Sequence, residues 1–160
     1  MRALHVSIAT LAAAVACMFP LMNGCTSKIN EEQIQTVLEA VDKAANEKNA
    51  DGILAHMADD VVVKLNVPNG RRSKTFSLNR DQYRRLLEEG YRVAQVYEFG
   101  RKGTRIKIAR DGKRAKVSSR TYETMRNQNG SQRTDSLETA TFELRNGKVV
   151  ITKVESIERT

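Results

Sequence analysis

The sequence predicts an α+β fold, in which N-terminal helices pack on an antiparallel sheet. Apolar residues recur at helical spacing in residues 31–46 and again in residues 80–95. After residue 95 the chain changes to alternating apolar and polar residues, and three Asp-Gly or Asn-Gly pairs divide it. Helices followed by a long meander of strands are typical of the α+β class.

The first 24 residues have the anatomy of a secretory signal peptide. Arg2 lies in a short leading segment, and residues 6–22 contain no charge. Gly24 then precedes Cys25, as in the lipobox of bacterial lipoproteins, where the cysteine is lipidated and becomes the new N-terminus. The match is imperfect, because Leu21 lies one place further upstream than usual. An ordinary thiol after another type of signal, a lipobox at Cys17 and a short membrane span are the alternatives.

We therefore expect a lipoprotein signal peptide over residues 1–24, a tether over 25–30 and one folded domain over 31–160. Such a protein would be exported and would face the periplasm from a membrane of the bacterial cell envelope, to which the lipid on Cys25 would anchor it.

Composition excludes several kinds of site. The chain has two cysteines and two histidines, and removing the signal would leave only Cys25 and His56. A disulfide within the chain, a cysteine metal site and a multi-histidine metal site are then excluded. The net charge of +8 raises the question of nucleic acid. The basic residues are dispersed and no nucleic-acid motif is present, so we expect no nucleic-acid partner. Because cysteine and histidine ligand sets are missing, we also expect no metal, and we expect no other cofactor.

The predicted helices have recognisable starts. Asn30 is a good N-cap, and Gln33 stands at the capping-box position. A short second helix is expected over residues 50–60, with Ile53, Leu54 and Met57 facing inward. Asn79 would cap the third helix. The apolar stripes of the first and third helices are Ile34, Val37, Leu38, Val41 and Ala45, and Tyr83, Leu86, Leu87, Tyr91 and Ala94.

Residues 61–67 are expected to form a strand that ends at Pro68-Asn69-Gly70, and residues 71–78 a loop or edge segment. The three later turns, Asp111-Gly112, Asn129-Gly130 and Asn146-Gly147, fit two-residue hairpins. Those turns fix which residues face each other across the strands. They place Ile106 opposite Val117, Val117 opposite Phe142, Ser119 opposite Ala140, Thr121 opposite Glu138, Glu123 opposite Ser136, and Phe142 opposite Ile151.

Residues 34–65, from the first helix through "LAHMADDVVVKL", resemble the opening of the nuclear transport factor 2-like (SnoaL-like) superfamily. The resemblance covers residues 31–158 and implies a cone in which the helices close one side of a curled antiparallel sheet. The superfamily includes isomerases, dehydratases, hydrolases and non-enzymatic binding modules, so it implies no single activity.

One predicted sheet face is strongly basic and the other is mostly apolar. The basic face is expected to be a solvated surface, or a surface for lipid headgroups or an acidic partner. Its charge argues against a fully apolar sheet-to-sheet dimer, although a polar homodimer stays open. The basic residues are Arg105, Lys107, Arg114, Lys116, Arg120, Arg126 and Arg133.

The apolar face becomes polar at one end, where Thr121, Glu123, Ser136 and Glu138 are expected. This could be the mouth of a pocket, or only a solvated overhang of long strands. His56 with Asp59 and Asp60 is a second cluster, but turn and packing roles suit it better than catalysis. The main hypothesis is a lipid-anchored binding protein for a small molecule in the cone or for a protein partner. The alternatives are a cone-fold enzyme with Glu123 or Glu138 as base, and a structural protein with a filled cone.

Overall fold

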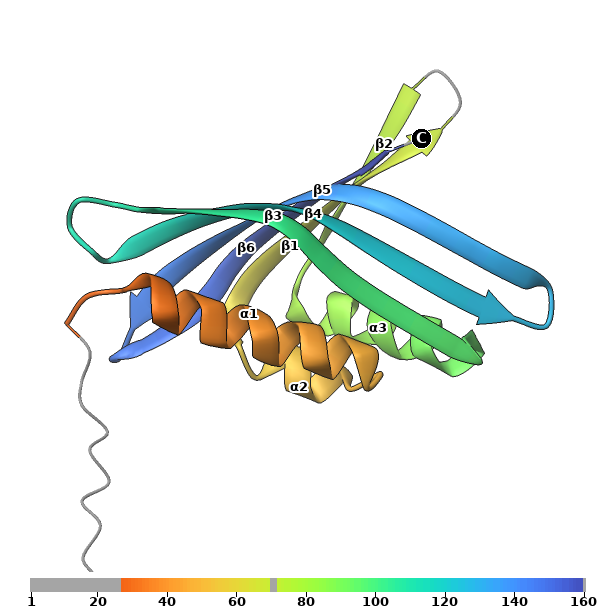
Figure 1. Cartoon of the computed structure of the whole chain (residues 1–160), viewed down its shortest axis with the longest axis horizontal. Coiled ribbons are helices and arrows are strands. Elements are labelled where there is room, and N and C mark those ends of the chain that lie inside the picture. Colours follow the sequence, from red (N-terminus) through yellow and green to blue (C-terminus); the bar gives the residue numbers. More distant parts are fainter. Residues whose placement is uncertain (1–26, 70–71, 160) are drawn as a thin grey trace, which may run out of the picture.

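The computed structural model describes residues 27–69 and 72–159 (Figure 1). The predicted signal peptide and Cys25 lie outside these residues. The elements, in chain order, are α1 (Glu31–Asn46), α2 (Ala50–Leu54), β1 (Met57–Asn69), β2 (Arg72–Leu78), α3 (Arg80–Val93), β3 (Val96–Ile108), β4 (Arg114–Asn127), β5 (Gly130–Arg145) and β6 (Lys148–Arg159).

The strands form one curved sheet, and the helices cover its concave side (Figure 1). The strand order is β2-β1-β6-β5-β4-β3, with β2 and β3 at the edges. This confirms the α+β class and the edge position of residues 72–78. The sheet is mixed, however, because β1 and β6 pair in parallel. No hairpin joins these two strands, so no turn forces them to run in opposite directions.

Both long helices begin as predicted. The Asn30 side chain accepts from the Gln33 amide at 2.8 Å, and the Gln33 side chain accepts from the Asn30 amide at 3.0 Å. Asn79 and Gln82 make the same capping box at α3. At the other end of α1, the Asn46 side chain accepts from the Phe99 amide and donates to the Phe99 carbonyl. These two bonds attach the C-terminal end of α1 to β3.

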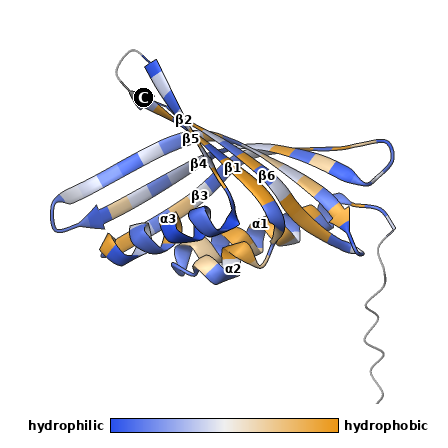
Figure 2. Cartoon of the chain, turned by 180° about the vertical axis from the view of Figure 1, so that it is seen from behind, coloured by the Kyte–Doolittle hydropathy of each residue, from blue (hydrophilic) through white to orange (hydrophobic). Residues whose placement is uncertain are grey.

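The core confirms the predicted apolar sheet face. Val117 and Phe142 are among its most completely buried side chains, with 1% and 0% of their surface exposed. They pack with Ile34 and Val37 of α1 and with Ile151 of β6 in one cluster. The central strands β1 and β6 carry long apolar stretches, whereas the projecting end of the β4–β5 hairpin is largely polar (Figure 2). The seven predicted outer-face cations are all exposed.

Two of the three predicted registers are correct beside their turns, and each shifts by one residue further along the strands. Ile106 pairs with Val117, and Phe142 pairs with Ile151. The register across β4 and β5 is wrong by two residues, because Asn127 pairs with Gly130 and the turn is formed by Gln128 and Asn129. Among the described residues other than glycine, only Lys48 and Asn146 have positive φ, so Asn129 does not adopt the left-handed conformation that the predicted turn needs. A shift of two residues leaves every side chain on its predicted face.

A bulge in β3 places Arg101 on the concave face. Near the turn, Arg105 pairs with Ser118, but beyond the bulge Lys102 pairs with Arg120, one residue out of step. Gly103 lies in the bulge with φ +61°, a conformation that glycine adopts without cost. Without the extra residue, Arg101 would face Tyr122 on the outer side of the sheet. With it, Arg101 pairs with Thr121 and points into the cone.

The segment before α1 lies against the domain. Ile29 is 4% exposed, and its amide donates to the Gly112 carbonyl in the β3–β4 turn at 2.8 Å. Lys113, in the same turn, donates from its side chain to the Ser27 carbonyl. The last residues of the expected tether therefore leave the domain beside that turn.

None of the helices in the described parts of the chain is long and apolar enough to cross a membrane.

Candidate functional site

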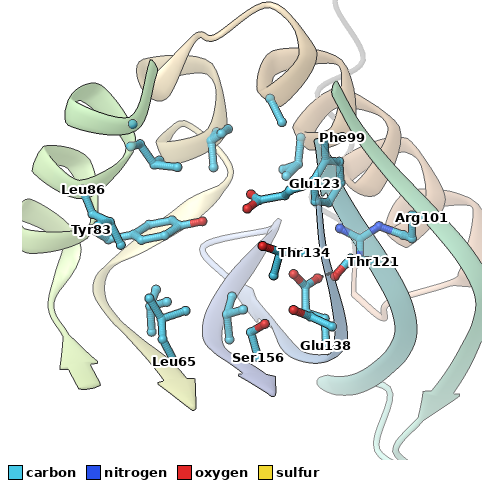
Figure 3. Close-up of a pocket in the computed structure, with 18 of the residues that line it drawn as sticks. Leu65, Tyr83, Leu86, Phe99, Arg101, Thr121, Glu123, Thr134, Glu138 and Ser156 are labelled. Atoms are coloured by element: carbon cyan, nitrogen blue, oxygen red, sulfur yellow. Dashed lines mark hydrogen bonds and ion pairs between the residues drawn. The ribbon is translucent and has the colours of Figure 1, made fainter. Parts of the chain in front are cut away.

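A cavity of about 340 Å³ lies between the helices and the concave face of the sheet. The helices supply mostly apolar groups to its wall, including Leu38 and Val41 of α1 and Leu87 of α3. Strands β3, β4, β5 and β6 supply most of the polar groups. Side chains do not fill the space between α3 and the curled sheet (Figure 3). The cone is therefore hollow on the side that α3 covers.

All four residues of the predicted pocket line this cavity, namely Thr121, Glu123, Ser136 and Glu138. Their pairing differs from the prediction. Glu123 faces Thr134 and Glu138 faces Ser119, so the two carboxylates are four strand positions apart. That spacing corresponds to about 13 Å along a strand. In the predicted register the two glutamates would be diagonal neighbours, two strand positions apart. That arrangement is wrong, and each glutamate has a different partner.

Glu138 belongs to a buried ion cluster around Arg101, whose side chain is 8% exposed. Arg101 Nη1 donates to Glu138 Oε1 and to Ser119 Oγ, both at 2.7 Å. Its Nε and Nη2 donate to the Asp42 carboxylate of α1. Burial lowers the pKa of Arg101, but Glu138 and Asp42 outweigh it and leave the pKa above its ordinary value. The cluster joins α1 to the sheet and forms one wall of the cavity (Figure 3).

Glu123 lies at the exposed side of the cavity beside three tyrosines. Tyr97 donates its hydroxyl to Glu123 Oε1 at 2.5 Å. The Tyr97 ring meets the Tyr91 ring edge to face, with 5.0 Å between centroids. The hydroxyl of Tyr83 on α3 points across the cavity toward the sheet, from which Glu123 projects (Figure 3). These residues form a phenol and carboxylate cluster that lies next to the Arg101 cluster along β3 and β4.

Burial, with a smaller contribution from the carboxylates, raises the pKa values of the three tyrosines. Burial raises the pKa of Tyr91 to about 12, and Glu123 adds to the effect. Burial and the Glu138 and Glu123 carboxylates raise the pKa of Tyr83 well above its ordinary value. The pKa of Tyr97 rises for the same reasons, burial first and Glu123 second. The three hydroxyls therefore stay protonated at neutral pH and can donate hydrogen bonds.

The second predicted cluster lies elsewhere. His56 is half-buried, and neither it nor Asp59 or Asp60 lines the cavity. Asp60 accepts from Arg145 at 2.5 Å, and this bond lowers the pKa of Asp60. Asp59 lies 3.8 Å from Arg80 and is fully exposed. Within the described parts of the chain, no three His, Cys, Asp or Glu residues are grouped so that they could hold a metal ion.

Sequence reasoning missed Arg101, Tyr97 and Phe99 as wall residues. The sequence predicted a strand over these residues, but the bulge decides on which face of the sheet their side chains lie. The available signal for a bulge was a glycine inside the strand. Gly103 is that glycine. Tyr83 and Tyr91 were predicted to face inward, as they do. Leu86 was too, but it lies at the edge of the cavity and is 44% exposed because nothing packs over it there.

A curled sheet closed by helices around an open cavity defines a class of cone-shaped domains, and solved structures of that class resemble this chain. One is a candidate dehydratase of the NTF2-like family from Streptomyces avermitilis, at 12% identity and TM-score 0.63, covering 80% of this chain and 95% of that one. A hexachlorocyclohexane dehydrochlorinase from Novosphingobium barchaimii gives 11% identity, TM-score 0.65 and coverage of 81% and 86%.

A third structure is a candidate calcium/calmodulin-dependent protein kinase II association domain from Xanthomonas campestris, at 17% identity and TM-score 0.65, covering 84% of this chain and 95% of that one. No family model and no curated protein matches the sequence. The chain therefore has the NTF2-like cone fold. At these identities the likeness concerns the fold alone.

Proposed function

We propose that this chain is a lipid-anchored protein of the bacterial cell envelope whose cone domain binds a small molecule. The observation that carries the binding proposal is the cavity, which is open at one side and combines a largely apolar wall with polar groups carried by the strands. Small-molecule sites are typically concave, mostly apolar and supplied with a few fixed polar groups. A filled cone, the structural alternative, lacks this space.

Binding can be tested with a neutral fluorescent probe, N-phenyl-1-naphthylamine, on the domain over residues 27–160. The variant Gly90→Phe adds a ring at a wall position of α3 where a new Cβ meets no atom within 4 Å. We expect the native domain to enhance the fluorescence of the probe and Gly90→Phe to suppress the enhancement. Val93→Phe, at an exposed position of the same helix, is the matched control. Equal enhancement by native domain and Gly90→Phe would contradict binding in this cavity.

The anchor proposal rests on the lipobox-like position of Cys25 after an uncharged segment. We expect detergent, but not high salt, to release the full chain from membranes. The Cys25→Ala variant should lose lipid labelling and appear in the soluble envelope fraction. Membrane association and processing unchanged by Cys25→Ala would show that the anchor proposal is wrong.

An enzyme is the second candidate, because Glu123 and the Tyr97 hydroxyl form a carboxylate and phenol pair at the cavity. Such a pair could remove a proton and donate another. No histidine lines the cavity in the described part of the chain. This candidate predicts that a molecule recovered from the cavity changes chemically on incubation with the protein, and that Glu123→Gln stops the change while retaining binding. An unchanged molecule would favour the binding protein.

A further inference from the structure

We propose that the cavity binds an organic cation, with an ammonium head group on an apolar body. This inference rests on the proposed small-molecule function and specifies the class of ligand. Two independent features carry it: the charges of the cavity wall and the aromatic rings that line it.

The cavity wall is acidic although the protein is basic. The ionisable carboxylates and cation that line it are Glu123, Glu138 and Arg101, and Asp42 lies directly behind Arg101. Counted as ionised groups, they leave an excess of negative charge. The exposed cations of the outer sheet face point away from the cavity. In a partly dry cavity a local charge of this kind outweighs the distant, solvent-screened cations of the surface.

An anionic ligand would find little cationic donor capacity in the described wall. Arg101 is the only Lys or Arg in the described wall, and all three of its side-chain nitrogens are already bonded, to Asp42, Glu138 and Ser119. These bonds use four of its five N–H groups, so at most one N–H of Nη2 is left for a carboxylate or phosphate, which would then lie near Glu138. The excess negative charge would repel it.

The wall is rich in rings that attract cations. Tyr83, Tyr91, Tyr97 and Phe99 all line the cavity. A cation near an aromatic face is stabilised by the ring quadrupole, and cages of such rings recognise quaternary ammonium groups. The protein itself uses one of these faces, since the Arg101 guanidinium lies 5.5 Å from the centroid of Phe99. The apolar body would lie against Leu38, Val41 and Leu87 on the helical side.

Tyr91 packs edge to face against Tyr97, and its hydroxyl oxygen is buried. The raised pKa values of the tyrosines agree with a potential that favours cations, because Glu123 and Glu138 contribute to them.

Three benzyl probes with tetrahedral head groups test the proposal: benzyltrimethylammonium, its uncharged isostere neopentylbenzene and the anion benzylsulfonate. Displacement of N-phenyl-1-naphthylamine from the native domain gives their relative affinities. We expect the ammonium to bind about tenfold more tightly than the isostere, corresponding to about 1.4 kcal/mol, and the sulfonate to bind most weakly.

Glu123→Gln should remove most of the preference for the ammonium, while Glu98→Gln, which removes an exposed carboxylate from the outer face of β3, should retain it. A preference that survives Glu123→Gln, or an isostere or sulfonate that binds as tightly as the ammonium, would overturn the cation proposal. Both results leave the small-molecule function standing, because the domain still binds. If neither the fluorescent probe nor any benzyl compound binds, the proposed function itself fails.

Discussion

Replacing Arg101 with methionine should destabilise the domain strongly, because it leaves two carboxylates without their cation. Arg101 is 8% exposed, and Asp42 and Glu138 retain 26% and 17% of their side-chain exposure. Breaking a fully buried ion pair costs about 3–5 kcal/mol. Since the carboxylates can recover some hydration, we expect a loss of about 2–4 kcal/mol in the free energy of unfolding. Urea denaturation of the domain measures this loss.

A triple variant provides a second test of the Arg101 cluster. Adding Asp42→Asn and Glu138→Gln to the Arg101→Met variant removes the uncompensated charges, so about half of the lost stability should return. Arg133→Met is a control at an exposed ion pair with Asp135 and should leave the free energy of unfolding nearly unchanged. A loss below about 1 kcal/mol in Arg101→Met, or a further loss in the triple variant, would refute the account of the cluster.

Three further changes have defined outcomes. Phe142→Ala should cost about 3–5 kcal/mol in urea denaturation, because Phe142 is fully buried; a loss near zero would mean that the core face is wrongly assigned. In a Tyr122→Phe background, the tyrosinate absorbance of the native domain should stay low at about pH 11. The free energy of unfolding should fall as pH rises from 10 toward 12, since the unfolded chain releases the Tyr91 proton near 10 and the folded chain near 12. Early ionisation in the native state would contradict a buried tyrosine cluster. Gly103→Ala should cost about 1 kcal/mol because φ is +61° there, whereas Gly90→Ala inside α3 should gain about 0.5–1 kcal/mol; equal effects would argue against the bulge.

The sequence predicted well the features that repeat along the chain. Helical spacing identified α1 and α3, and Asn30 and Asn79 marked their first turns because capping depends on local side-chain chemistry. Alternation identified the core face correctly even where the β4–β5 register was wrong, since an error of two residues preserves the face. For that reason Thr121, Glu123, Ser136 and Glu138 reach the cavity wall despite their changed partners.

The contacts inside the cavity were not predictable in the same way. Arg101 reaches the wall only because one extra residue enters β3, and nothing periodic in the sequence records an insertion. Its partner Asp42 comes from α1, so the ion cluster depends on how the helix docks on the sheet. The parallel pairing of β1 and β6 is likewise a long-range feature, which turn residues cannot specify.

The docking of Ile29 on the β3–β4 turn sets the direction in which the cavity would face in a cell. If Cys25 carries the proposed lipid, a few residues at most separate the bilayer from this turn, with a reach of about 3.5 Å for each residue. Glu123 lies nine residues further along β4 than Arg114, which corresponds to about 30 Å. The domain would then stand with its β3–β4 turn on the membrane and its binding site held away from it. Ligand would be exchanged with the aqueous compartment and not with the lipid phase.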